Sequence, residues 1–170
     1  MKELNINVQK LSKDAKLPNR AYPEDSGADI FANKSVKIEP FEQKIVETDI
    51  ALDIPEPTFI EHFVKDDVYF KKEQLDIVWE IQIRSKSGLA AKQNLFVMNQ
   101  PATIDNSYTG ELKVILFNAN TLSVKIEKGQ KIAQIILCPV VIPSFKEIDR
   151  NLINDDKNRK NNGFGSTGLK

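Results

Sequence analysis

Two carboxylates occupy positions in this sequence that suit acid–base or phosphate chemistry. Asp105 lies in the stretch Ile104-Asp-Asn-Ser-Tyr-Thr-Gly-Glu, where the following residues favour a tight turn and Tyr108 offers a flat aromatic face. A carboxylate held at a turn can act as a general base. The same stretch also fits an ordinary Asx turn with a packing tyrosine. Asp29, in Ser26-Gly-Ala-Asp-Ile, is a similar carboxylate between a turn and a strand, and taken alone it is interpreted as structural.

Three further segments have the composition of anion-binding loops. Ser85-Lys-Ser-Gly combines hydroxyls, an ammonium group and a glycine at the start of a predicted short helix. Gly163-Phe-Gly-Ser-Thr-Gly offers similar groups, with Arg159 and Lys160 upstream. A capped helix and a flexible tail are the alternative interpretations. The third segment, Gly129-Gln-Lys-Ile-Ala-Gln, reads more simply as a hairpin turn entering a buried strand.

The composition excludes several kinds of chemistry. The chain has 170 residues, one histidine (His62) and one cysteine (Cys138), so neither a Cys/His zinc site nor an intramolecular disulfide can form. Lys and Arg number 24, as do Asp and Glu, and this zero net charge argues against nucleic acid as a partner. No apolar run is long enough to suggest a membrane partner or a signal peptide, so we expect a cytoplasmic protein.

Alternating apolar residues predict a sheet protein. Period-two patterns run through residues 4–8, 36–38, 50–54, 77–83, 112–116 and 122–126, and a denser apolar run covers 132–142. One short helix is expected, opened by Ser87 and built on Leu89, Ala90 and Ala91. The pattern therefore predicts an all-β sandwich or barrel with little helix.

Two segments depart from this pattern. Residues 57–78 mix aromatic and charged side chains and read as an insertion, either a surface hairpin or short helix, or a surface for a protein partner. Residues 151–170 are polar up to the final glycine-rich segment and read as a flexible C-terminal arm. We therefore expect a β domain over residues 1–150 and a mobile arm over residues 151–170.

All seven glycines lie in five short segments, and none lies in the insertion. In chain order these segments are 21–30, 86–90, 102–111, 129–134 and 159–168, and in this order they resemble the five motifs of the trimeric dUTP pyrophosphatase (dUTPase) family. The resemblance runs from residue 4 to residue 168 apart from the insertion. The third and fifth segments match most completely.

The resemblance implies a jelly-roll-like distorted β-barrel or sandwich with a short helix after the second motif. It also implies a homotrimer whose active sites are shared between subunits. The activity would be Mg²⁺-dependent hydrolysis of dUTP to dUMP and pyrophosphate, which lowers dUTP and supplies dUMP for thymidylate synthesis. Its location would be the bacterial cytoplasm, or the host cytoplasm if a phage encodes the chain.

The family's site residues map onto this sequence by motif. Asp105 would be the general base that activates water for in-line attack on the α-phosphorus. Asp29 would act near the metal, indirectly through water. The uracil and deoxyribose would be contacted by Asn99, Ile104, Tyr108, Gly110 and Phe164. The phosphates would be bound by Lys86, Ser87, Gly88, Gln134, Arg159, Gly165, Ser166 and Thr167.

Three positions depart from the family pattern: Lys86 stands where arginine is common, and Ala102 and Lys160 stand where glycine is common. The lysine replaces a planar fork by a point charge. Two other functions stay open. One is a dCTP deaminase-like nucleotide enzyme, and the other is a regulatory dUTP-binding protein that acts through the insertion.

Overall fold

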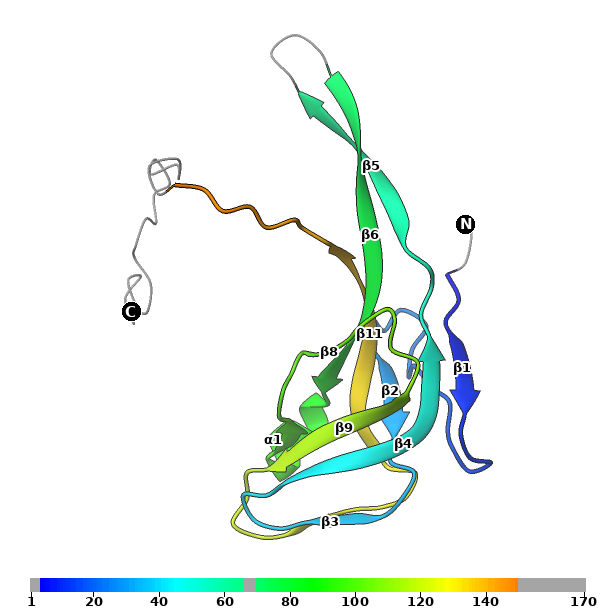
Figure 1. Cartoon of the computed structure of the whole chain (residues 1–170). Helices are drawn as coiled ribbons and strands as arrows, with labels where there is room; N and C mark the ends of the chain where they lie inside the picture. The colour runs from blue at the N-terminus through cyan, green and yellow to red at the C-terminus, as the bar shows by residue number, and fades with distance from the viewer. Residues whose placement is uncertain (1–3, 66–69, 150–170) are drawn as a thin grey trace.

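The protein has two main sheets and a separate two-stranded pair, described by a computed structural model over residues 4–65 and 70–149 (Figure 1). The first sheet has the order β1 (Asn7–Lys10), β4 (Gln43–Asp53), β9 (Glu111–Asn118) and β7 (Leu95–Val97). The second has the order β2 (Ala28–Phe31), β11 (Lys131–Val141), β6 (Phe70–Ser85) and β5 (Thr58–Lys65), and β8 (Ala102–Ile104) also pairs with β6. β3 (Val36–Ile38) pairs with β10 (Val124–Ile126), and α1 covers Ser87–Gln93.

Alternate residues of the strands form the core. In β9 the buried positions are Leu112, Val114, Leu116 and Asn118, which places every second side chain on one face. The largest side chains that are almost completely buried come from both sheets and from the β3–β10 pair: Ile30, Ile38, Val46, Ile50, Ile81, Ile83, Leu95, Val97, Leu112, Leu116, Ile126 and Ile132. The two sheets are thus held together by a continuous apolar layer between them.

The all-β prediction is confirmed, as is the short helix after the second motif. The described strands form open sheets and no closed barrel, so the structure is a jelly-roll-like sandwich. The helix begins at Ser87, as expected, but the expectation that a serine hydroxyl caps it is wrong. Lys86 is the N-cap and makes no side-chain capping bond, and Ser87 is the first helical residue. The Ser85 hydroxyl instead accepts the Val97 backbone N–H at 2.8 Å.

A bulge interrupts β4 opposite the start of β9. Glu47 pairs with Lys113 and Ala51 pairs with Glu111, so four residue steps on β4 match two steps on β9. Asp49 lies inside the bulge with a φ of 52°. The bulge inserts two extra residues, an even number, so the alternation of burial keeps its phase, and Val46, Ile50, Leu52 and Ile54 are all buried.

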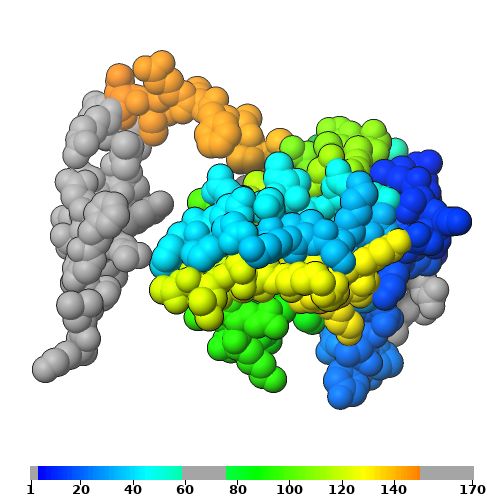
Figure 2. Space-filling model, turned by 90° about the horizontal axis from the view of Figure 1, so that it is seen from below, coloured from blue at the N-terminus to red at the C-terminus, as the bar shows by residue number. Residues whose placement is uncertain are grey.

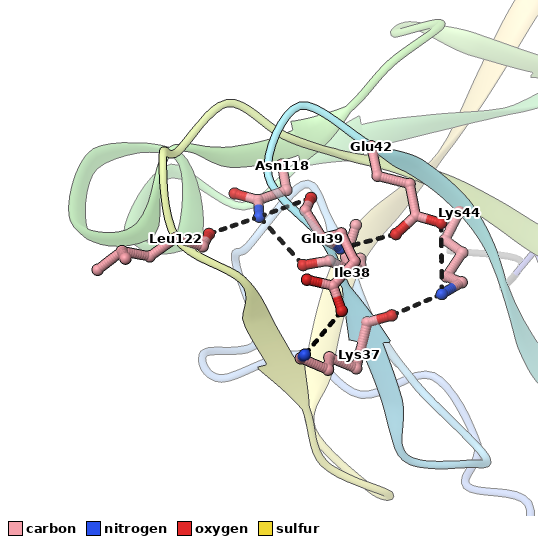
Figure 3. Close-up of polar contacts among 7 residues, drawn as sticks. All are labelled: Lys37, Ile38, Glu39, Glu42, Lys44, Asn118 and Leu122. Atoms are coloured by element: carbon pink, nitrogen blue, oxygen red, sulfur yellow. Dashed lines mark hydrogen bonds and ion pairs between the residues drawn. The ribbon is translucent and has the colours of Figure 1, made fainter.

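The β3–β10 pair closes one end of the sandwich, where its strands lie side by side (Figure 2). The buried side chain of Asn118 joins this pair to β9 (Figure 3). Its Nδ2 group lies 3.1 Å from the Ile38 carbonyl oxygen, 3.0 Å from that of Glu39 and 2.9 Å from that of Leu122. A buried amide with its partners in place fixes the end of β9, the strand that begins beside the Asp105 turn.

The β5–β6 hairpin projects from the sandwich (Figure 1). Its register runs from Thr58 opposite Ile77 to Lys65 opposite Phe70, and Ile77 is also the residue at which the pairing of β6 with β11 ends. The inserted segment is therefore a two-stranded ribbon, and its second strand continues into the sandwich as far as Ser85. β6 therefore leads from the insertion directly to the second motif.

The described chain leaves the body after β11. Residues 142–149 extend away from the sandwich (Figures 1 and 2), and Phe145 is 95% exposed. The predicted arm over residues 151–170 lies outside the described residues. Within the described residues, the single helix is too short to span a membrane.

Candidate functional site

The Asp105 turn follows β8 directly. β8 pairs with β6, with Ala102 opposite Ile83 and Ile104 opposite Ile81, so the preceding strand fixes where the turn begins. The Tyr108 backbone N–H donates to the Asp105 carbonyl oxygen at 3.0 Å, which closes the turn. The Asp105 residue itself is exposed. A carboxylate on an ordered turn with access to solvent can meet both a water molecule and a substrate.

Tyr108 folds back over its own turn. Its hydroxyl donates to the Glu111 carbonyl oxygen at 2.9 Å, and the residue is 44% exposed. A Cβ atom at Gly110 would lie 2.6 Å from this hydroxyl oxygen and 2.7 Å from the ring carbon that carries it. Gly110 is therefore required by the close approach of the Tyr108 ring, and the remaining exposed part of that ring is available for a ligand.

The loop that carries Asn99 is tied to the second motif. Asn99 lies in the turn between β7 and β8 and is exposed. The Ser85 backbone N–H donates to Gln100 Oε1 at 3.0 Å, and the Ser85 hydroxyl holds the end of β7. These contacts place Asn99 at one end of β8 and Asp105 at the other. Ile104 lies between them, half-buried against the core.

A buried ion cluster joins the first, second and fourth motifs. Asp29 on β2 is 3% exposed and lies directly opposite Gln134 on β11. Its Oδ1 atom lies 2.5 Å from Lys86 Nζ and accepts a bond from Gln134 Nε2 at 3.1 Å. Its Oδ2 atom lies 2.7 Å from Lys131 Nζ. Two ammonium groups and one carboxylate leave one net positive charge here.

The charge state of Asp29 follows from these partners. Burial on its own would raise the pKa of the Asp29 carboxyl. The hydrogen bonds from Lys131, Lys86 and Gln134 act in the opposite direction and together outweigh burial, so the pKa lies below the ordinary value of 3.8. Asp29 is therefore ionised at neutral pH and fixes both lysine ammonium groups.

The other phosphate-binding candidates lie beside this cluster. Ser87 and Gly88 follow Lys86 at the start of α1 and are both exposed. A Cβ atom at Gly88 would meet no atom within 4 Å, so the space above this backbone is open. The Gln134 amide is already bonded to Asp29. The five arm candidates, Phe164, Arg159, Gly165, Ser166 and Thr167, lie outside the described residues.

The surroundings of Asp29 do not fit a directly bound metal ion. Both of its carboxylate oxygens already face ammonium groups, which repel a cation. Elsewhere, carboxylate oxygens of Glu47, Asp49 and Glu111 lie within 4.8 Å of one another around the β4 bulge. Each of these carboxylates already has a partner: Lys34 for Glu47, Asn33 for Asp49, and the Asp49 N–H together with Lys113 for Glu111. These contacts give the cluster a structural role in closing the bulge.

Sequence reasoning missed two residues of the site, Lys131 and Asn106. Lys131 lies within the fourth motif, and a signal for it was present, because a buried aspartate requires a cationic partner. The Asn106 side chain bonds to backbone carbonyl groups far away in the sequence. The sequence singled out this segment because of Asp105, but it gave no sign of the Asn106 contacts.

Comparison with known proteins identifies the family. A sequence profile described as dUTPase matches residues 13–59 and 79–168. The chain is 37% identical over 166 residues to a deoxyuridine 5'-triphosphate nucleotidohydrolase of Gloeothece citriformis, covering 98% of each chain. It is 40% identical to the protein of that name from Hydrogenobaculum, covering 98% of this chain and all of the other. The chain therefore belongs to the dUTPase family.

Solved structures agree with this assignment. A mutant dUTPase of Staphylococcus bacteriophage 80alpha, solved with dUpNHpp, is 26% identical, with a TM-score of 0.78 and coverage of 97% of this chain and 99% of the other. A mutant dUTPase of the S. aureus phage phi11, described as coordinating a structural Mg(II) ion, shares the fold at 23% identity and a TM-score of 0.69, covering 85% of this chain and 97% of the other.

The hairpin falls in the part of the chain that the family profile does not match, between residues 59 and 79. The hairpin does not make this chain longer than its relatives. Because the comparison with the Gloeothece protein covers 98% of both chains, that relative is about as long as this one.

Proposed function

We propose that this protein hydrolyses dUTP to dUMP and pyrophosphate, with Asp105 as the general base. The family membership carries this proposal, together with full-length similarity to proteins named deoxyuridine 5'-triphosphate nucleotidohydrolase. The geometry supports it, because an exposed carboxylate stands on an ordered turn beside a partly exposed tyrosine ring. These relatives favour the hydrolase over a deaminase-like enzyme.

The chemistry assigned to Asp105 is the activation of one water molecule. The carboxylate accepts a proton from water as its oxygen attacks the α-phosphorus in line with the departing pyrophosphate. The bond between the α-phosphorus and the oxygen that bridges the α- and β-phosphates breaks. The α-phosphate stays on the nucleoside as dUMP, and the bridging oxygen leaves with pyrophosphate. Catalysis then depends on positioning and on neutralising the phosphate charge, since phosphoryl transfer needs little covalent help from the protein.

Selectivity for deoxyuridine would come from the β8 loops. Asn99 at one end of β8 would read the edge of the uracil ring, and backbone groups near Gly110 would complete the pocket. A site built to bond fixed donors and acceptors rejects a base with a reversed pattern. The Tyr108 ring would pack against deoxyribose and leave no room for a 2′-hydroxyl.

The ion cluster around Asp29 would supply the positive charge that binds the phosphates. Lys86 and Lys131 are both held by Asp29, and their side chains are 22% and 43% exposed. Their ammonium groups can therefore meet an anion while they remain paired. Ser87 and the open backbone at Gly88 would add donors next to Lys86. Arg159, Gly165, Ser166, Thr167 and Phe164 of the arm are proposed to close over the nucleotide.

The register of β6 and β8 supports the proposal that one site needs two copies of the chain. Continuing this register places Asp105 opposite Glu80, five residues from Ser85, or about 17 Å along the strand. A nucleotide laid from Asn99 to Asp105 would point its terminal phosphates away from Lys86 of the same copy. We therefore assign the ion cluster of each site to a neighbouring copy, in a homotrimer with shared sites.

A Mg²⁺ ion would be bound mainly by the triphosphate and water. The residues around Asp29 do not fit direct coordination, which leaves at most a contact through water. When bound, the ion would neutralise phosphate charge. No step assigned to the protein's own residues depends on it.

A protein partner at the 57–78 hairpin finds no support in the described residues. The function proposed here does not require one.

Hydrolysis in ¹⁸O-labelled water tests the proposed reaction. The full-length protein is incubated with dUTP and Mg²⁺, and the products are analysed by mass spectrometry. The proposal predicts dUMP and pyrophosphate in equal amounts, with the label in dUMP. Label in pyrophosphate, or the release of inorganic phosphate or ammonia, would contradict it.

A further inference from the structure

Two short strands share one edge of β6 and leave a gap between them. β11 covers the other edge of β6 from Ile77 to Ser85. On the edge of β6 away from β11, β5 pairs with β6 as far as Ile77, and β8 pairs with β6 from Ile81 to Ile83. Among the described residues, no strand pairs with the β6 backbone between these two stretches on this edge. Trp79 lies in this gap.

The Asn106 side chain fills the gap. Its Nδ2 group donates to the Trp79 carbonyl oxygen at 3.2 Å and to the Pro55 carbonyl oxygen at 2.9 Å. A primary amide has two hydrogens, so both donors are used. Continuing the β8–β6 register places Asn106 directly opposite Trp79. The side chain thus bonds where a backbone N–H would have continued the ladder.

The two acceptors are the two ends of the hairpin stem. Pro55 lies just before β5, and Trp79 lies where β6 enters the sandwich. One amide therefore joins the first strand of the hairpin, its second strand and the turn after β8. The turn it anchors is that of Asp105, the adjacent residue.

We propose that Asn106 is a positioning residue that holds Asp105 in its reactive place by fixing the turn to both ends of the hairpin stem. This inference rests on the proposed function for its catalytic consequence. Its structural part, the fixing of the turn, can be measured without substrate. Displacements of about 1 Å at a reacting group can cost about 100-fold in rate, so two hydrogen bonds at this point have a large effect.

The test compares the full-length wild type with Asn106→Ala, and uses Asn106→Ser as a second variant that can still donate one bond. Asn7→Ala is the matched control, since it removes a side-chain amide bond to Asp53 at 2.9 Å on the exposed strand β1. The expected result is a kcat about 10- to 100-fold lower for Asn106→Ala, with KM changed less than about threefold. The control keeps the wild-type values.

A double-mutant cycle separates positioning from a general structural role. If Asn106 acts through Asp105, Asn106→Ala adds no further loss of kcat once Asp105→Asn is present. Losses that multiply in the double variant would overturn the inference, as would an unchanged kcat in the single variant. A fall in kcat for Asn106→Ser smaller than that for Asn106→Ala supports it.

Amide hydrogen exchange tests the fixing of the turn independently of turnover. The Tyr108 N–H, which bonds to the Asp105 carbonyl, should exchange at least roughly tenfold faster in Asn106→Ala. The Met98 N–H, bonded to the Ile115 carbonyl at 2.9 Å, serves as the internal reference and should not change. Unchanged Tyr108 exchange would overturn the inference. A wild type that releases no pyrophosphate would overturn the proposed function alone, because the exchange result stands without it.

Discussion

Asp105 and Asp29 are both aspartates near strand ends, and their surroundings give them opposite roles. Asp29 is buried and bonded on both oxygens, whereas Asp105 is exposed on a turn. A general base must have an oxygen free to accept a proton from water. A carboxylate that holds cations in place has its oxygens occupied by those cations. The chemistry is therefore assigned to Asp105, and the fixing of the cations to Asp29.

The first residue-scale prediction concerns Asp105→Asn. The amide keeps the shape of the side chain but is a poor base, so kcat should fall by at least about 100-fold while dUTP still binds. Steady-state kinetics and calorimetric titration with a non-hydrolysable dUTP analogue measure the two quantities. Retained turnover would remove Asp105 from the mechanism.

The second concerns the pH dependence of stability through Asp29. Its pKa is lowered in the folded protein, so its stabilising contribution is complete above the ordinary value of 3.8 and is lost as the pH falls through the lower, folded-state pKa. Asp29→Asn should therefore be less stable than the wild type at neutral pH, by roughly 1–3 kcal/mol. The difference should shrink in acid.

Urea unfolding between about pH 7 and about pH 2 checks this prediction. Asp53→Asn, which changes an exposed carboxylate at the end of β4, is the control. Equal stability of Asp29→Asn and the wild type at neutral pH would contradict the structural role of the ion cluster.

At the scale of elements, β6 connects most parts of the site. This 16-residue strand forms one side of the hairpin, pairs with β11 and β8, and ends at the second motif. The stem of the hairpin, around Pro55 and Trp79, contacts the Asp105 turn through Asn106. The outer part of the ribbon is therefore expected to be dispensable for turnover.

Shortening the hairpin tests this expectation. Replacing residues 61–74 by Asn-Gly joins Ile60 to Leu75, which already face each other, through a favoured two-residue turn. The kcat/KM for dUTP should stay within about threefold of the wild type, because the contacts of the stem remain. A shortened protein that folds but loses turnover would instead assign the outer ribbon a part in catalysis.

The strands were predictable where burial alternates along them. Residues 112–116 and 132–142 correspond to β9 and β11 because one or both faces of these strands are covered. β7, with three residues, is too short to show a period. The bulge at Asp49 depends on contacts with Glu111 across the sheet, which no local pattern encodes.

The candidate site was predictable as motifs but not as contacts. Lys86 and Asp29 were both recognised, yet their ion pair joins residues 57 positions apart. The Asn106 contacts depend on where β5 and β8 stop along β6. Such features follow from tertiary pairing, so they require the folded structure.

At the scale of the whole molecule, the neutral chain concentrates its positive charge locally. The formal net charge is zero, and the Asp29 cluster carries one excess positive charge at the start of α1. Anion binding at such a place relies on fixed cations and oriented N–H groups. Because this cluster lies away from Asp105 within one copy, the proposed shared site would be complete only in an assembly of copies.

Mixing two inactive variants tests the shared site. Asp105→Asn and Lys86→Ala are unfolded together in equal amounts and refolded, so that copies assort at random. If each site takes Asp105 from one copy and Lys86 from its neighbour, about a quarter of the sites receive both native residues and regain activity. No recovery, with mixed oligomers confirmed by native mass spectrometry, would place both residues in one copy's site.

The central claim is tested most directly by pyrophosphate release from dUTP, dTTP, dCTP and UTP at equal concentrations with Mg²⁺. The protein should release pyrophosphate from dUTP at least about 100-fold more efficiently than from the other three, since a wrong base edge, a methyl group or a 2′-hydroxyl would each disturb the base and sugar contacts proposed at the two ends of β8. Binding of dUTP without release of pyrophosphate, or preferred turnover of dCTP, would contradict the account.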